Sequence, residues 1–161
     1  MRTSSPATAT TPAGQVDEAA LQAIWPRLVR LGRLLTGSQE QGEDIAQEAI
    51  VGLLRHDAVL SPEAYLRRSV VNLSINHTRR SVRERTYLKS LGKPETIQAP
   101  VTDEIWPIVK TLPARQRAVL VLRYYEDLSE SDIAAILDCR PGTVKSLAAR
   151  GLARLQQEIT S

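Results

Sequence analysis

The spacing of apolar residues constrains the fold of this chain more than any other feature, because such residues recur at steps of three and four along most of it. The first run of this kind consists of Leu21, Ile24, Leu28, Leu31 and Leu35. This spacing places the side chains on one face of an α-helix. Aromatic residues make up only 4% of the chain and Phe is absent, which favours helices packed through aliphatic side chains over a β-sandwich. The sequence therefore predicts an all-α protein.

Three helices are predicted in the first half of the chain, over residues 17–35, from about 41–43 to about 57, and from 62 to about 85. The dipeptide Thr36-Gly37 supplies a stop signal for the first helix. Ser61-Pro62 fits the N-cap and first-turn positions of the third helix. The predicted buried face of the second helix consists of Ile45, Ala49, Leu53 and Leu54.

The stretch from 90 to 102 separates this helical block from a second one. It contains one Gly, two Pro and no sustained apolar period, which is typical of a linker. A short helix is expected from Asp103 to about 110, and another begins around Leu112-Pro113. The chain is thus expected to form two small helical domains joined by a flexible linker. The predicted boundaries are a disordered tail at 1–16, a first domain at 17–89, the linker at 90–102 and a second domain at 103–161.

Two helices separated by a three-residue break end the second block. The first is predicted at Glu130–Leu137, capped by Ser129, and the second runs from Pro141 to about 159. This arrangement, with the positive charge on the second helix, predicts a helix-turn-helix. The second helix is expected to bury Val144, Leu147, Ala148 and Leu152. The side chains left on or beside its outward face are Thr143, Lys145, Ser146 and Arg150, which suit contacts with bases and phosphates in the major groove.

Charged residues are segregated along the chain, although its net charge is only +3. Residues 65–89 contain seven Arg or Lys and one acid, and residues 139–155 contain four Arg or Lys and no acid. Residues 39–48 contain four acids and no base. This segregation favours contact with a polyanion at the two basic segments and with a different partner at the acidic one. Taken singly, each run is also compatible with a solvated helix face.

No cofactor, metal site or catalytic centre is expected from the sequence. The single cysteine, Cys139, excludes an internal disulfide and fits a reducing compartment, and His56 and His77 have no partners at metal-ligand spacing. The sequence contains no phosphate-cradling Gly-rich motif or hydrolase motif, so an enzyme is not expected. It has neither a secretory signal nor an apolar stretch long enough to span a membrane, which predicts a cytoplasmic protein without membrane insertion.

Two segments of the chain resemble parts of a known family. Residues 112–155, with the motifs LPARQR, IAAIL and GTVKS, resemble region 4 of the sigma-70 superfamily, which recognises the minus-35 promoter element. The segments LTGSQEQGEDIAQEAIVGLLRH and SPEAYLRRSVVNLSINHTRR resemble region 2 of extracytoplasmic-function (group IV) sigma factors. Both regions occur in the order typical of the family, and together they cover residues 20–158 approximately.

The resemblance implies roles for the charged surfaces of the first block. The acidic helix of region 2 docks on the clamp helices of the largest subunit of core RNA polymerase, and the residues that match it are Asp44, Gln47 and Glu48. The following helix grips the minus-10 element and captures an unstacked base. The residues matching this role are Tyr65, Arg67, Arg68, Asn72, Asn76, Arg79 and Arg80. Asn76 stands where many members of the family have Asp.

In the second block, the resemblance implies that the helix-turn-helix contacts the minus-35 element. The candidate residues are Arg140, Thr143, Lys145, Ser146 and Arg150. Arg140 departs from the family pattern, in which Ser or a similar cap is frequent. Arg115 and Arg117 are expected to contact phosphate or polymerase. The implied partners are core polymerase, including the flap of its second-largest subunit, promoter DNA, and an anti-sigma factor as a candidate regulator.

These features predict an alternative sigma factor that binds core polymerase, directs it to promoters through the minus-10 and minus-35 elements and promotes DNA melting. Two other interpretations stay open. A sigma-like protein that sequesters an anti-sigma factor or regulator would need the docking faces, but not Arg79, Arg80, Lys145 and Arg150. An ordinary helix-turn-helix repressor or activator would not need the acidic helix. The residues present favour the initiation factor.

Overall fold

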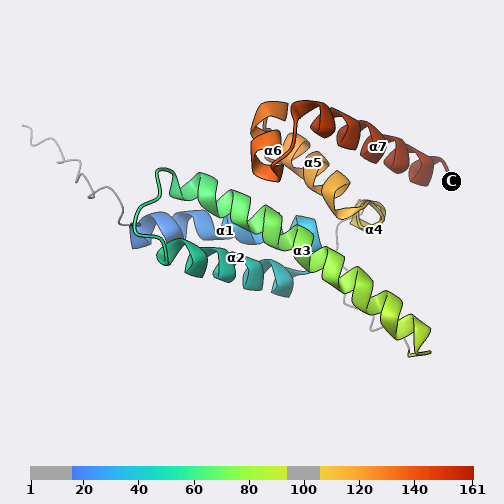
Figure 1. Cartoon of the computed structure of the whole chain (residues 1–161), viewed down its shortest axis with the longest axis horizontal. Coiled ribbons are helices and arrows are strands. Elements are labelled where there is room, and N and C mark those ends of the chain that lie inside the picture. Colours follow the sequence, from blue (N-terminus) through green and yellow to red (C-terminus); the bar gives the residue numbers. More distant parts are fainter. Residues whose placement is uncertain (1–15, 94–105) are drawn as a thin grey trace, which may run out of the picture.

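The computed structural model describes residues 16–93 and 106–161, and in this part of the chain all regular structure is helical. The helices form two groups that lie side by side (Figure 1). The all-α prediction is therefore confirmed. The helices are α1 (Glu18–Thr36), α2 (Gln39–Leu54), α3 (Pro62–Ser90), α4 (Trp106–Val109), α5 (Ala114–Tyr124), α6 (Glu130–Leu137) and α7 (Pro141–Thr160). The greater part of the predicted tail and linker, and residues 103–105 of a predicted helix, lie outside the described residues.

Helices α1, α2 and α3 pack together as the first unit. Its most deeply buried side chains include Leu31, Leu53, Leu66, Val70 and Val71. Gly37 and Ser61 are end signals that the sequence predicted, whereas Asp17 was predicted as part of the first helix and is its N-cap. Asp17 caps α1 by accepting a hydrogen bond from the N–H of Ala19 at 3.2 Å, and Gly37 ends it with a φ of 85°. Ser61 caps α3 through its hydroxyl, which accepts from the N–H of Ala64 at 3.3 Å.

Helix α2 differs from its predicted bounds at both ends. It begins at Gln39, because the Ser38 hydroxyl accepts a hydrogen bond from the N–H of Gln41 at 3.3 Å and thereby caps the first turn. It ends at Leu54, and this side chain is 62% exposed. The prediction that Leu54 is buried was wrong, since Leu53 faces the core and neighbouring residues of a helix point about 100° apart.

The second half of α3 extends well beyond the first unit (Figure 1, lower right). The helix continues to Ser90 rather than ending at Arg85, as the sequence predicted. The last of its buried residues is Ile75, and the side chains from 82 to 87 are exposed. The projecting half of α3 thus presents a solvated surface that carries several of the predicted DNA contacts.

Two glycines allow the backbones of α1 and α2 to come into contact. A Cβ placed on Gly32 would lie 2.9 Å from the Cα of Gly42. A Cβ placed on Gly42 would lie 2.7 Å from the carbonyl oxygen of Val29 and 2.8 Å from the nitrogen of Arg33. Side-chain rearrangement cannot relieve either contact, because the opposing atoms belong to the backbone.

We therefore expect Gly42→Ala to lower the free energy of unfolding by about 3 kcal/mol, since the added methyl group must separate α1 from α2. Urea denaturation followed by circular dichroism measures this change. Gly142→Ala is the matched control, because a Cβ at Gly142 meets nothing within 4 Å. This control should be neutral or slightly stabilising. Unchanged stability of Gly42→Ala would contradict the backbone contact.

Helices α5, α6 and α7 form the second unit, in which Val119, Leu122, Ile133 and Val144 are fully buried. Ser129 caps α6, as predicted, by accepting from the N–H of Asp132 at 3.1 Å. Leu152 was expected in the buried stripe of α7, but it is 43% exposed. Gly151 is buried in its place, because the Leu120 side chain of α5 fills the space beside it.

The two units are in contact with each other. Helix α5 packs against α1 and α3, and α6 packs against α3. The arrangement of the domains relative to each other was not deducible from the sequence, and it decides which of the predicted site residues are accessible.

Candidate nucleic-acid and protein interfaces

Helix α7 is the second helix of the helix-turn-helix, and its first half carries the predicted minus-35 contacts. Val144, Ala148 and Gly151 are its buried residues, and the helix packs against α5 and α6. The opposite side of α7 faces solvent. The predicted contacts are all exposed, namely Arg140, Thr143, Lys145, Ser146 and Arg150. The structure thus presents two hydroxyl groups and three cations along the beginning of one accessible helix.

Arg140 occupies the N-cap position of α7 without capping it, because its side chain makes no hydrogen bond to the first turn. A guanidinium group has donors but no acceptor, so it cannot satisfy the free N–H groups there. Pro141 follows at the first helical position, where a missing N–H is tolerated. The N–H groups of Thr143 and Val144 donate to the carbonyl oxygen of Arg140 at 2.9 and 3.3 Å. The start of α7 therefore offers an anion the Arg140 cation and the positive end of the helix dipole.

Glu130, at the start of α6, lies between two basic side chains. Its carboxylate is 3.3 Å from the Nη1 of Arg123 and 3.8 Å from the Nζ of Lys145. The Lys145 side chain remains 70% exposed, so this long ion pair contributes little to stability. A phosphate group can therefore compete with Glu130 for Lys145 at small cost.

The outer face of α2 carries the predicted polymerase contacts. Asp44, Gln47 and Glu48 are exposed, while the opposite face of the helix is buried against α1 and α3. Sequence reasoning missed one part of this surface. Val51 follows Gln47 by four residues, so it shares the acidic face, and it is exposed like its neighbour Leu54. The face combines acidic and apolar groups, and the same helical spacing would have identified Val51.

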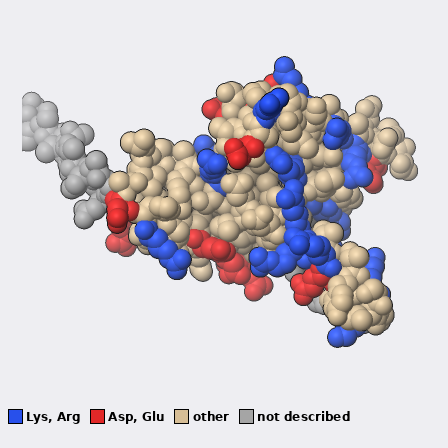
Figure 2. Space-filling view, in the orientation of Figure 1, with Lys and Arg blue, Asp and Glu red and all other residues tan. Residues whose placement is uncertain are grey.

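The predicted minus-10 residues on α3 do not form one compact cluster. Fifteen residues separate Tyr65 from Arg80, which corresponds to about 22 Å along the helix. Arg68, Asn76, Arg79 and Arg80 are exposed. Figure 2 shows Lys and Arg side chains gathered where α3 leaves the first unit, at the lower right of the molecule. The accessible part of the predicted surface therefore consists of this part of the helix and of Arg68 nearer its start.

The other three predicted minus-10 residues are partly buried. Asn72 lies within the first unit. Tyr65 packs edge-on against His56, with the ring centroids 5.2 Å apart. Arg67 forms ion pairs with Glu63 and with Glu126 of the second unit. In this conformation these three side chains are less accessible than those farther along α3.

Arg117 does not fit the predicted contact with phosphate or polymerase in this conformation. Its side chain is buried, with the residue only 5% exposed. Its guanidinium donates hydrogen bonds to the carbonyl oxygens of Leu35 at 2.8 Å, Lys110 at 2.8 Å and Leu112 at 3.1 Å. Burial, with a smaller effect from the charge of Arg85, lowers the pKa of Arg117 to about 10, so the group stays charged at neutral pH.

Arg115 also has an internal partner. Its Nη2 donates a hydrogen bond to the carbonyl oxygen of Leu137, at the end of α6, at 3.2 Å. The last carbonyl groups of a helix have no partner within the helix and favour a cation. Both arginines of the LPARQR motif therefore bind backbone carbonyl groups in this structure, a role that the sequence pattern did not indicate.

The two units correspond to two family models. Residues 21–84 match the model for Sigma-70 region 2, and residues 103–155 match the model for Sigma-70, region 4. The RNA polymerase sigma-E factor of Streptomyces avermitilis is 33% identical over 144 residues, which cover 83% of this chain and 79% of that protein. The ECF RNA polymerase sigma factor SigM of Mycobacterium tuberculosis is likewise 33% identical, over 80% of this chain and 69% of SigM. The chain belongs to the extracytoplasmic-function sigma factors.

The fold of this sigma factor is also that of a solved relative. The sigma factor RpoE of Bartonella quintana, whose structure was determined in complex with the anti-sigma factor NepR, superimposes with a TM-score of 0.66 at 22% identity. The match covers 89% of this chain and 96% of RpoE. Within residues 16–93 and 106–161, no helix of the sigma factor is both long enough and apolar enough to cross a bilayer.

Proposed function

We propose that this protein is an alternative sigma factor that binds core RNA polymerase, directs it to specific promoters and promotes DNA melting there. The observation that carries this proposal is the presence of two exposed surfaces of opposite charge in one chain. Helix α7 exposes cations and hydroxyl groups, and α2 exposes acidic and apolar groups. Family membership supports the proposal that the first surface binds DNA and the second binds polymerase.

The minus-35 element is the proposed ligand of α7. Arg140, Lys145 and Arg150 can donate to phosphate oxygens or to guanine in the major groove, and Thr143 and Ser146 can contact either bases or phosphates. Arg140 is the proposed determinant of promoter preference, because its guanidinium is not used for capping. Arg115 and Arg117 are left out of this surface because both bind backbone carbonyl groups.

The minus-10 element is the proposed ligand of α3. Arg68, Asn76, Arg79 and Arg80 lie on its accessible surface. Arg67 joins them once Glu126 of the second unit no longer pairs with it, whereas Tyr65 is held within the first unit by its contact with His56. Capture of an unstacked base costs less when the strands are already separating, so this surface is suited to the melted promoter.

Core polymerase is the proposed partner of α2, through Asp44, Gln47 and Glu48. A negative face with exposed Val51 and Leu54 fits a partner surface that is basic and carries apolar groups. The proposed partner surface is that of the clamp helices of the largest subunit. The flap of the second-largest subunit is the proposed partner of region 4. An anti-sigma factor is a candidate regulator, since the similar RpoE was solved with one.

Transcription in vitro tests the proposed function. Core polymerase purified from the organism that encodes the chain is expected to initiate from a defined subset of a genomic promoter library when the protein is added, and not without it. Binding to core polymerase without initiation from any promoter would favour a protein that sequesters a regulator. Promoter binding without any need for core polymerase would favour an ordinary helix-turn-helix regulator.

A further inference from the structure

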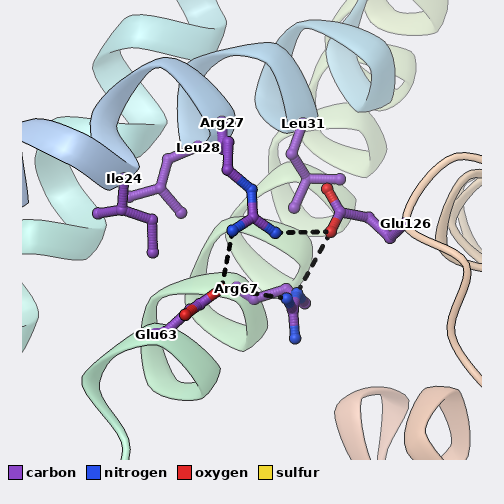
Figure 3. A pocket seen from close by; sticks show the side chains of 7 residues that line it. All are labelled: Ile24, Arg27, Leu28, Leu31, Glu63, Arg67 and Glu126. Atoms are coloured by element: carbon purple, nitrogen blue, oxygen red, sulfur yellow. Dashed lines mark hydrogen bonds and ion pairs between the residues drawn. The ribbon is translucent and has the colours of Figure 1, made fainter.

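Four charged side chains meet where the two units touch (Figure 3). Arg27 comes from α1, Glu63 and Arg67 from α3, and Glu126 from the segment after α5. Arg27 Nη1 is 2.9 Å from the Glu63 carboxylate, and Arg67 Nη2 is 3.6 Å from the same oxygen. These two contacts lie within the first unit.

Glu126 connects this cluster to the second unit. Its Oε2 is 3.5 Å from the Nε of Arg67 and 3.8 Å from the Nη2 of Arg27. The side chain of Glu126 is only 9% exposed and that of Arg67 is 22% exposed, so solvent screens this pair less than a surface pair, whereas Arg27 is 56% exposed. The apolar side chains of Ile24, Leu28 and Leu31 line the same pocket, and Leu31 is the one nearest to the carboxylate (Figure 3). A buried carboxylate is stable there only while its charge is paired, so Glu126 stays in this position only while both guanidinium groups face it.

Two guanidinium groups that converge on one carboxylate oxygen can also hold a phosphate oxygen. Arginine binds both anions through the same N–H donors. Removal of Glu126 leaves two arginines against one acid, Glu63, so the cluster changes from neutral to a charge of +1. Glu126 leaves the cluster when the second unit moves away from the first. This movement also uncovers the side of α3 that carries Arg67, which belongs to the proposed minus-10 surface.

We propose that Arg27 and Arg67 form a binding site for a backbone phosphate of promoter DNA, and that Glu126 occupies this site in the free protein. The proposal rests on the proposed function for the assignment of Arg67 to DNA. Arg27 is an additional DNA contact that neither the sequence pattern nor the charge runs indicated. Glu126 acts as an internal competitor, because DNA gains the site only when region 4 moves away from region 2.

A second contact limits how far removal of Glu126 alone can open the protein. Arg117 of α5 donates to the carbonyl oxygen of Leu35, at the end of α1, and this bond also joins the two units. Loss of the Glu126 ion pairs is therefore expected to shift the population toward the open form rather than to separate the units completely. The apparent affinity for DNA rises as the competent fraction rises.

The test uses the full chain with Glu126→Gln, without polymerase. Spin labels on Ala58→Cys and Ala153→Cys, both exposed positions, report the distance between the units in a Cys139→Ser background. Anisotropy of a fluorescein-labelled, mixed-sequence single-stranded 20-mer reports binding to DNA. For Glu126→Gln we expect a population of molecules in which the two labels are farther apart. We expect its Kd for the oligonucleotide to be lower than that of the wild type by at least about threefold. Glu158→Gln is the control, since it removes the same charge from an exposed position of α7.

Arg27→Gln in the Glu126→Gln background tests the phosphate site itself. It is expected to abolish the gain in affinity and to reduce the slope of log Kd against log salt by about 0.7, the value for one phosphate contact on a single strand. Inorganic phosphate, at a concentration equal to that of the phosphate groups of the oligonucleotide, should leave the distance between the units unchanged in the wild type. Opening by inorganic phosphate would overturn the assignment of the site to DNA.

Glu126→Asp provides a second route if Glu126→Gln fails to fold. Its shorter side chain keeps the charge but cannot reach both arginines, so we expect a smaller shift in the same direction. An unchanged distance distribution, together with a Kd within twofold of the wild type, in both folded variants would refute the proposal that Glu126 competes with DNA for this site. Because none of these measurements contains polymerase, the result does not depend on the outcome of the transcription assay.

Discussion

The double variant Lys145→Glu, Arg150→Glu is expected to reduce transcription from a promoter with a minus-35 element by at least about 100-fold, while binding to core polymerase stays unchanged. Each charged contact to DNA is worth about 1–3 kcal/mol, and 1.4 kcal/mol corresponds to a factor of ten. Reversal also adds repulsion from the phosphates. Both side chains are exposed, so the change does not disturb a buried contact. Runoff transcription and a core-binding assay by anisotropy measure the two effects.

Two further variants make this prediction specific. Arg154→Glu reverses a charge on the same exposed helix, but farther from its N-terminus, and should reduce transcription much less. Lys145→Gln with Arg150→Gln removes the charges without placing a new carboxylate next to Glu130, which is 3.8 Å from Lys145. It should reduce transcription in the same direction and by a smaller factor. Loss of core binding in the charge-reversed variant would indicate that α7 is not primarily a DNA surface.

The variant Asp44→Lys, Glu48→Lys is expected to show the opposite behaviour. It should weaken binding to core polymerase by about 100-fold, because like charges facing each other across an interface cost several kcal/mol. The isolated protein should still bind a mixed-sequence oligonucleotide as the wild type does, since α7 and the far half of α3 are unchanged. Competition with the wild type for a limited amount of core polymerase measures the first effect, and oligonucleotide anisotropy measures the second.

The control for this variant is Glu18→Lys with Asp57→Lys. It produces the same change of net charge in the same unit, at exposed acids outside α2. This control should retain core binding within about twofold, as expected for surface charges away from an interface. Equal loss of core binding in both variants would show that net charge, rather than the face of α2, governs the interaction.

Local signals in the sequence predicted most of the secondary structure. Ser61 and Ser129 each cap a helix with their own side chain, and Gly37 adopts the positive φ that ends α1. These interactions join residues within one helical turn, so they can be recognised without the fold. The exposed faces of α2 and α7 follow from helical spacing in the same way, and with them the two surfaces that carry the proposed function.

Apolar residues at the margins of helical faces were predicted less well. Leu54 and Leu152 have suitable spacing, but neighbouring elements do not cover them. Val51 belongs to the accessible surface of α2 for the same reason. Spacing identifies which residues share a face, whereas burial depends on the width of the partner that packs there.

The sequence by itself determined an all-α chain of two helical units, the helix-turn-helix, and the separation of acidic from basic surfaces. Only the tertiary structure decided which of the basic residues are free. Arg117 finds its acceptor on Leu35, 82 residues earlier in the chain, and Arg67 finds Glu126 on the other unit. The sequence around a charged residue can be the same whether its side chain faces solvent or a buried carbonyl group. Its role depends on the partner that the fold brings to it.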